Sequence, residues 1–211
     1  MKIGIIGKGH VGTALATGLR HRGHEIRFAS TDPNEPVDKA AAYGAVVILA
    51  VPYPAVPDVL SKACAELVNK TLIDVTNVLN PEGGLALGCT TSGAEEIQRQ
   101  LPKTNVVKAF NTVFAQNQST GHTDHHQLTA FIAGDDPKAR DLVGALAADI
   151  GFQPIDCGDL TAARYLEPMG ALIIDLAFEQ SLGTDIGYIL TGIPREKQAE
   201  YLGRAEHFLT V

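Results

Sequence analysis

The feature that most constrains the fold is a glycine-rich stretch close to the N-terminus. Gly7-Lys8-Gly9-His10-Val11-Gly12 has the spacing G-x-G-x-x-G, follows the apolar run Ile3–Ile6 and opens the helix-like segment Val11–Arg22. Between a strand and a helix, this pattern is typical of a dinucleotide-binding βαβ unit. The first glycine permits the tight turn, the second lets a pyrophosphate approach the main chain, and the third lets helix and strand pack closely. We therefore expect a pyrophosphate at the N-terminus of this helix, within reach of Lys8 and His10.

The remainder of the chain alternates between apolar runs and helix-like segments. The expected strands are Lys2–Ile6, Glu25–Ala29, Ala45–Val51, Leu72–Val75, Val106–Ala109, Leu128–Ala133 and Phe152–Asp156. This alternation predicts an α/β protein with a Rossmann-type, doubly wound and mostly parallel sheet. From Leu160 onward the chain looks helical. We expect an NAD(P)-binding Rossmann domain over residues 1–160, and a small C-terminal helical appendage over residues 161–211 that packs on it and completes the substrate site.

Ligands of such sheets bind outside the carboxyl ends of the strands, at the point where the strand order reverses. That geometry nominates the residues that directly follow each expected strand. They are the glycine turn, Ser30-Thr31, Pro52-Tyr53, Thr76-Asn77 and Phe110-Asn111-Thr112.

The end of the second strand decides which dinucleotide is expected. An acidic residue there favours NAD because it accepts from the ribose 2′-hydroxyl, whereas donors and positive charge favour NADP. Ser30 and Thr31 can donate to a 2′-phosphate, and Arg22 or Arg27 could add charge, but Asp32 would oppose a phosphate if it pointed inward. NADP is therefore favoured, with NAD as the alternative.

Composition limits the remaining possibilities. The 211 residues carry a formal charge of −7, which argues against a nucleic-acid partner. The sequence has no apolar run of membrane-spanning length, and the location expected is cytoplasmic. Cys64, Cys89 and Cys157 are scattered, and the histidines of residues 122–126 read as a solvated loop, so no metal is expected.

Several stretches carry a resemblance to a known family. They are MKIGIIGKGHVG (1–12), VVILAVPY (46–53), IDVTN (73–77), VVKAFNTV (106–113) and FIAGDD (131–136). The chain resembles the NADPH-dependent reductases of the deazaflavin coenzyme F-420 over about residues 1–180. The cytosolic domain of the membrane ferric reductases has a similar core.

The resemblance implies a role for individual residues. The pyrophosphate would be held by Gly7, Lys8, Gly9, His10 and Val11. Ser30 and Thr31 would hold the 2′-phosphate, although Thr31 replaces the usual arginine of the family. Val51 and Pro52 would lie along the cofactor, and Asn77, Ala109, Phe110 and Asn111 would approach the nicotinamide.

The expected reaction is a hydride transfer that needs positioning more than acid–base chemistry. The sequence contains neither a Tyr-x-x-x-Lys dyad nor a G-x-S-x-G nucleophile motif. We therefore expect an NAD(P)H-dependent oxidoreductase with a flavin-like or deazaflavin acceptor, in which Asn77 and Asn111 fix the nicotinamide. The alternative is an NADP(H)-binding redox sensor without catalysis. The apolar stretch Ala162–Phe178 could line the acceptor ring or form the interface of a homodimer.

Overall fold

A single sheet of seven strands forms the centre of the protein. In the computed structural model, residues 1–80, 84–87, 90–194 and 196 are described. The strand order is β2-β1-β3-β4-β5-β6-β7. The strands are β1 (Lys2–Ile6), β2 (Glu25–Ala29), β3 (Val46–Leu49), β4 (Thr71–Asp74), β5 (Asn105–Ala109), β6 (Thr129–Gly134) and β7 (Gln153–Asp156).

The pairing of the strands confirms the mostly parallel sheet. β1 to β5 pair in parallel, β6 pairs antiparallel with β5, and β7 pairs in parallel with β6. Every residue of β3 and β4 is buried, as expected for strands covered on both faces. β1 lies between β2 and β3. The chain passes from β1 to β2 on one side and then crosses to β3 on the other side of β1. This reversal of the strand order is a topological switch point, and it lies at the carboxyl ends of β1 and β3.

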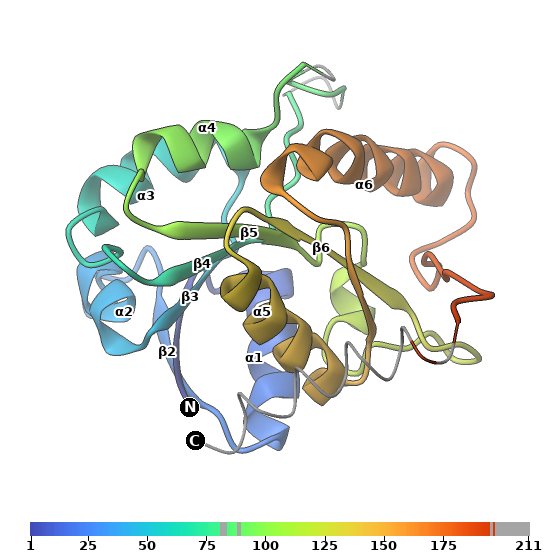
Figure 1. The fold of residues 1–211 in the computed structure, drawn as a ribbon, viewed down its shortest axis with the longest axis horizontal. Coiled ribbons are helices and arrows are strands. Elements are labelled where there is room, and N and C mark those ends of the chain that lie inside the picture. The colour runs from blue at the N-terminus through green and yellow to red at the C-terminus, as the bar shows by residue number, and fades with distance from the viewer. Residues whose placement is uncertain (81–83, 88–89, 195, 197–211) are drawn as a thin grey trace.

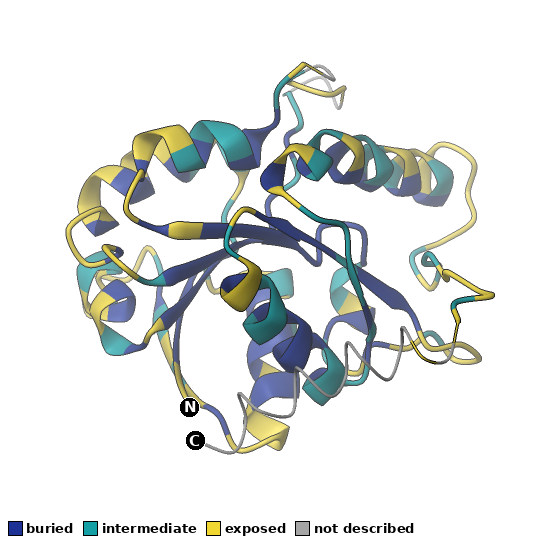
Figure 2. Cartoon of the chain, viewed as in Figure 1, coloured by how far each residue is buried: buried dark blue, intermediate teal, exposed yellow. Residues whose placement is uncertain are grey.

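Helices cover both faces of the sheet (Figure 1). They are α1 (His10–His21), α2 (Val37–Tyr43), α3 (Val56–Ala63), α4 (Gly93–Gln100), α5 (Pro137–Ile150) and α6 (Ala163–Phe178). On one face, Leu15 and Leu19 of α1 and Leu146 of α5 share a core. On the other, Leu60 of α3 and Ile97 of α4 belong to a second core. The buried side of each helix faces the sheet and its exposed side faces outward, so the doubly wound prediction is confirmed (Figure 2). None of the helices in the described ranges combines the length and the apolar character that a bilayer crossing requires.

The expected C-terminal helical segment begins with α6. α6 runs through Pro168 and ends at Phe178, and residues 179–194 contain no helix. Gly183 and Gly192 both have φ of +75°, a conformation that interrupts a helix. The irregular stretch lies against the start of β6, where the Thr129 N–H donates to the Tyr188 carbonyl over 2.9 Å. The remaining residues of the expected appendage, 195 and 197–211, lie outside the described residues.

Candidate functional site

A cleft opens at the switch point, between the carboxyl ends of β1, β2 and β3. It encloses about 760 Å³. Seven of the residues expected to bind the cofactor line it: Gly7, Lys8, Gly9, Ser30, Thr31, Val51 and Pro52. Its other walls come from α2 and α3, through residues such as Val37 and Val59. The volume and the apolar walls with a polar rim suit a small organic ligand.

The glycine turn has the geometry that a pyrophosphate site needs. Gly7 has φ of +111°, which L side chains rarely adopt, and a Cβ on Gly12 would overlap the Gly7 carbonyl oxygen. A Cβ on Gly9, in contrast, would meet no atom within 4 Å and would project into open space. Gly7 and Gly12 are therefore required by the fold, whereas Gly9 leaves open the space that a phosphate group would fill.

The first turn of α1 can receive an anion. Gly9 is its N-cap residue and carries no capping side chain, and the first turn contains no acidic residue. The N–H groups at the start of a helix have no partner within the helix, and the helix dipole favours negative charge there. His10 is exposed, while Val11 packs against the core, so Val11 can contribute its backbone N–H but not its side chain. These residues fit a pyrophosphate.

Three side chains meet beside the loop after β2: Lys8 of the glycine turn, Ser30 and Glu35. The sequence predicted a role for the first two but not for Glu35. The Lys8 ammonium donates to Glu35 Oε1 over 2.5 Å, and the Ser30 hydroxyl donates to Glu35 Oε2 over 2.6 Å. The hydrogen bond from Lys8, followed by that from Ser30, lowers the pKa of Glu35. Glu35 lies six positions after the end of β2 and beyond Pro33, so distance along the chain did not single it out.

The other charged groups considered for the 2′ position make contacts of their own, although Asp32 lines the cleft. Asp32 Oδ1 accepts from the backbone N–H of Asn34 over 2.8 Å, so this carboxylate closes its own turn. Arg22 caps the far end of α1, a helix of 12 residues and hence about 18 Å long, so its expected contribution to the phosphate site is wrong. Arg27 stacks on Tyr43, with its guanidinium carbon 4.5 Å from the ring centre. Thr31 is exposed at the rim.

The two asparagines expected at the nicotinamide end lie next to each other. Asn111 Nδ2 is 3.5 Å from Asn77 Oδ1, and it donates over 2.7 Å to the Leu166 carbonyl in α6. Asn111 is 4% exposed, and Asn77 is half-buried. α6 approaches this pair through Gly170, where an added Cβ would overlap Asn77 Oδ1 and lie 2.7 Å from Asn111 Nδ2. The asparagine pair is therefore the point where α6 meets the ends of β4 and β5.

Ala109 and Phe110, which are expected to approach the nicotinamide, have side chains that belong to the core. Both are buried, and the Phe110 ring packs at 5.6 Å, between centroids, against Phe152. Phe110 has φ of +63°, which is uncommon for a residue with a large side chain. Its turn directs Asn111 toward α6, and its side chain belongs to the core.

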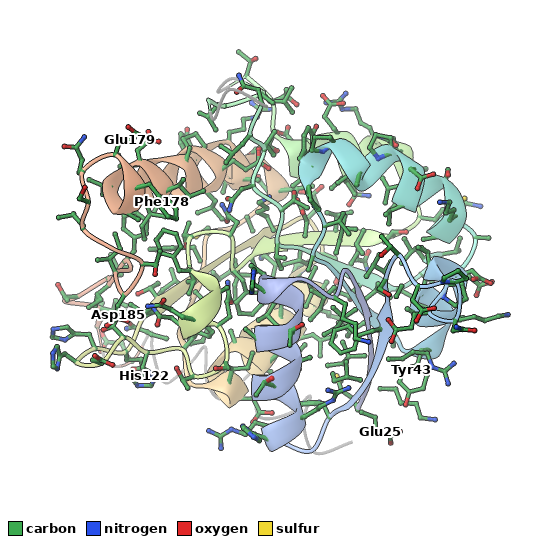
Figure 3. The ribbon with its side chains drawn as sticks, turned by 180° about the vertical axis from the view of Figure 1, so that it is seen from behind. Glu25, Tyr43, His122, Phe178, Glu179 and Asp185 are labelled. Atoms are coloured by element: carbon green, nitrogen blue, oxygen red, sulfur yellow. The ribbon has the colours of Figure 1, made fainter. Side chains whose placement is uncertain are left out.

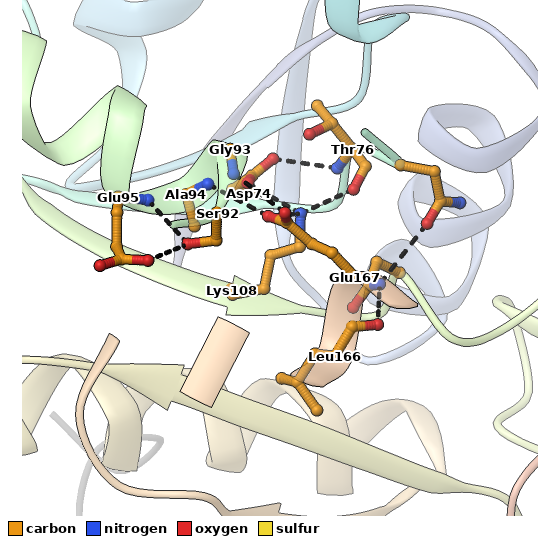
Figure 4. A network of polar contacts seen from close by, with 11 residues as sticks. Asp74, Thr76, Ser92, Gly93, Ala94, Glu95, Lys108, Leu166 and Glu167 are labelled. Carbon is orange, nitrogen blue, oxygen red and sulfur yellow. Dashed lines mark hydrogen bonds and ion pairs between the residues drawn. The ribbon is translucent and has the colours of Figure 1, made fainter. Parts of the chain in front are cut away.

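A buried ion cluster beside the asparagines links the sheet to α6 (Figure 4). The Lys108 ammonium is fully buried and lies 2.9 Å from Asp74 Oδ2 and 3.2 Å from Glu167 Oε1, and it also donates to the Thr76 carbonyl over 2.6 Å. Burial lowers the pKa of Lys108, but the charges of Asp74 and Glu167 outweigh it, and the net shift is upward. Glu167 also accepts from the backbone N–H groups of Gly93 and Ala94 at the start of α4. The sequence analysis assigned no role to these charged residues.

A second ion pair ties α4 to the start of α6. Arg164 donates to both carboxylate oxygens of Glu95, over 2.9 and 2.6 Å. Ser92 caps α4 by accepting from the Glu95 N–H, and its hydroxyl donates to the Glu95 carboxylate. The bond from Arg164 is the main cause of the lowered pKa of Glu95. α6 is thus held to the Rossmann unit by two charged contacts.

The histidine-rich loop and the end of α6 lie away from the cleft, on the side of the molecule where Figure 3 labels His122, Asp185 and Phe178. His122 Nδ1 pairs with the Thr120 carbonyl over 2.8 Å, and the Asp124 N–H donates to Asp185. Phe178 packs edge-on against Phe114, with ring centres 6.1 Å apart. Within the described part of the chain, no three histidine, cysteine or acidic side chains converge as metal ligands do.

Comparison with known proteins places this site in a family. Residues 2–44, which contain the glycine turn and the loop after β2, match the family model described as NADP oxidoreductase, coenzyme F420-dependent. The chain is 30% identical to the F420-dependent NADP reductase of Methanothermobacter marburgensis, over 92% of this chain and 100% of the relative. It is 30% identical to the metalloreductase STEAP3 of Rattus norvegicus over 79% of this chain, which spans only 36% of that relative.

Solved structures agree with the sequence comparisons. The crystal structure of a protein from Arthrobacter sp. FB24, assigned as an F420-dependent NADP reductase, superposes with a TM-score of 0.84 at 27% identity, and the match covers 91% of this chain and 100% of that one. Fold and site together define a Rossmann-type oxidoreductase. The chain belongs to the family of F420-dependent NADP reductases.

Proposed function

We propose that the cleft binds a nicotinamide dinucleotide, with NADP preferred, and that the protein transfers a hydride between it and a flavin-like or deazaflavin acceptor. The observation that carries this proposal is the open space at Gly9, directly in front of the uncapped N-terminus of α1. A pyrophosphate is the group that such a turn accommodates. The relatives named as F420-dependent NADP reductases support NADP as the dinucleotide and a deazaflavin as its partner.

The residues divide into an adenosine half and a nicotinamide half. Gly7, Lys8, Gly9, His10 and the Val11 backbone would hold the pyrophosphate, and Ser30 and Thr31 would face the adenosine ribose. Val51 and Pro52, which follow β3, would lie along the cofactor, because the same cleft contains them. Asn77 and Asn111 would border the nicotinamide, together with the backbone of Ala109 and Phe110, because both turns lie at the carboxyl edge of the sheet.

The chemistry asked of the protein is positioning and exclusion of water. When bound, a reduced dinucleotide supplies a hydride, which carries two electrons to the acceptor ring. Asn77 and Asn111 carry neutral amides, which suit hydrogen bonding to a carboxamide and not proton transfer. The Lys108 cluster holds the turn at Thr76 and the start of α6 in fixed positions beside them. No general acid or base is assigned.

Exposed apolar side chains near α6 suggest where a further molecule packs. Leu172, Phe178 and Leu182 are each more than half exposed. Such side chains are unfavourable when left in contact with water. We propose that this face contributes to a homodimer and that residues 161–211 complete the acceptor side of the site.

A second candidate is a protein that binds NADP(H) and catalyses nothing. The observation that favours it is the hydrogen bond between Asn111 and the Leu166 carbonyl, because this contact closes α6 over the asparagine pair. In a sensor, dinucleotide binding would be read out through the position of α6 without turnover.

Titration followed by an acceptor screen tests the proposal. The purified protein is titrated with NADPH and with NADH by calorimetry, and then assayed for oxidation of the better ligand by deazaflavin, flavin and quinone acceptors. Saturable binding with turnover of one ring acceptor is expected. Binding without turnover would favour the sensor, and the absence of binding would remove both candidates.

A further inference from the structure

Glu35 occupies the place that decides which dinucleotide fits. Its carboxylate bridges Lys8, in the glycine turn, and Ser30, at the end of β2, which are the cation and the hydroxyl closest to the expected 2′ position. The loop itself directs Glu35 back to the strand ends, because the Ser30 N–H donates to the Glu35 carbonyl over 3.0 Å and the Glu35 N–H donates to the Asp32 carbonyl over 2.9 Å. The contact is therefore built by the backbone of the loop.

The charge balance of the cleft makes this carboxylate important. Among the described residues that line the cleft, Lys8 and Lys62 are the cations and Asp32 and Asp58 are the acids, and Lys62 is 2.7 Å from Asp58. Glu35 does not line the cleft and acts on it through Lys8 and Ser30. Lys8 is thus the cation available to a phosphate at this end, and it is already paired with Glu35. A 2′-phosphate carries about −1.5 to −2 charges at neutral pH and would meet a like charge.

We propose that Glu35 is an internal ligand of the Lys8–Ser30 pair that a 2′-phosphate must displace, so that Glu35 limits the preference of this protein for NADP over NAD. With a ribose 2′-hydroxyl the carboxylate stays in place and accepts a hydrogen bond. With a 2′-phosphate, the phosphate takes the donors of Lys8 and Ser30, and the carboxylate turns away. The proposal rests on the proposed function, since it requires a dinucleotide in the cleft.

A second hollow adjoins the loop, and Glu35 already lines it, so the carboxylate can leave Lys8 and Ser30 without entering the cleft. The hollow encloses about 870 Å³, and Lys8, Arg20, Arg27 and Lys39 also line it. Glu35 is 27% exposed, so its side chain is not enclosed by the protein. In this hollow the carboxylate would face positive charge, which reduces the cost of leaving Lys8.

The test replaces the charge and keeps the shape. Calorimetry measures the affinity of wild-type protein and of Glu35→Gln for NADPH and NADH, and for the fragments 2′,5′-ADP and 5′-AMP, which isolate the 2′ group. We expect Glu35→Gln to raise the ratio of NADPH affinity to NADH affinity at least tenfold, with the same change for 2′,5′-ADP relative to 5′-AMP. Glu66→Gln is the control, because it removes one charge at an exposed residue that lines neither the cleft nor the second hollow.

Each outcome decides the matter. A change in the ratio of less than tenfold in Glu35→Gln, or an equal change in Glu66→Gln, would overturn the role of Glu35 and leave the dinucleotide site intact. Wild-type protein that binds neither NADPH nor NADH would overturn the proposed function itself. Thermal unfolding of both variants confirms that any change in affinity arises in folded protein.

Discussion

Gly9 is the residue whose environment most directly suggests a ligand. It has φ of −79° and ψ of −170°, an extended conformation that any residue can adopt, and no protein atom lies near its missing side chain. Gly9→Val should therefore leave the melting temperature close to that of the wild type, yet abolish dinucleotide binding in calorimetry, because the added carbons fill the phosphate position.

Gly12→Val is the informative comparison for this prediction. A Cβ there overlaps the Gly7 carbonyl, so this variant should lose stability as well as binding. If Gly9→Val binds NADPH as the wild type does, the glycine turn is not the pyrophosphate site.

Lys108 is the residue on which the stability of the site depends most. Its removal leaves the Asp74 and Glu167 carboxylates buried with no cation between them. Loss of one partner from a buried ion cluster costs about 3–5 kcal/mol, so Lys108→Met should lower the free energy of unfolding in urea by that amount. Lys103→Met, at an exposed lysine just before β5, should change the free energy of unfolding by less than about 0.5 kcal/mol. Equal stabilities of the two variants would show that the cluster is not structurally important.

At the scale of elements, α6 packs on the asparagine pair that we propose to border the nicotinamide. Gly170→Ala inserts a methyl group where Asn77 and Asn111 lie. We expect it to slow hydride transfer at least tenfold, about 1.4 kcal/mol of barrier, while 5′-AMP binding stays within twofold of the wild type. Asn111→Leu should act in the same direction, because it removes the amide. The measurement is single-turnover oxidation of NADPH, with Lys103→Met, at an exposed residue outside α6, as control. A wild-type rate of hydride transfer in Gly170→Ala would show that the packing of α6 does not affect the reaction.

The ion pair between α4 and α6 predicts a pH dependence. Arg164 and Ser92 lower the pKa of Glu95 from its ordinary value of 4.5, so the charged form is stabilised in the folded protein. The stabilisation is complete above pH 4.5 and is lost as the pH falls through the lowered pKa. Urea unfolding should therefore show that wild-type protein is more stable than Glu95→Gln near neutral pH and that this difference shrinks below pH 4.5. A difference that is constant with pH would exclude the carboxylate charge as its cause.

At the scale of the whole molecule, local features of the sequence were sufficient for the architecture. The glycine turn is contiguous, and buried strands such as Val46–Leu49 appear as uninterrupted apolar runs, so both could be recognised without knowledge of tertiary contacts. The capping box that Ser92 and Glu95 form at the start of α4 is local in the same way. The contacts of Tyr188 and Leu190 with Thr129 of β6 could not be predicted, because they join residues about 60 positions apart.

The charged residues of the site also depend on contacts between distant parts of the sequence. Glu35 contacts Lys8 across 27 positions, and Glu167 reaches Gly93 across 74, so their roles depend on the fold and not on neighbouring sequence. Lys108 lies inside an apolar strand, where a charge is unfavourable unless it is paired. The position of a lysine within an apolar strand was visible in the sequence, but its partners Asp74 and Glu167 were not.

The most direct test of the account is a single-turnover experiment with wild-type protein. NADPH is bound in the cleft, an equal amount of the deazaflavin coenzyme is mixed in, and the absorbance of both is followed. The account predicts that NADPH is oxidised and that one deazaflavin is reduced for each NADPH consumed. Protein that binds NADPH but transfers no hydride to a deazaflavin, flavin or quinone would contradict it.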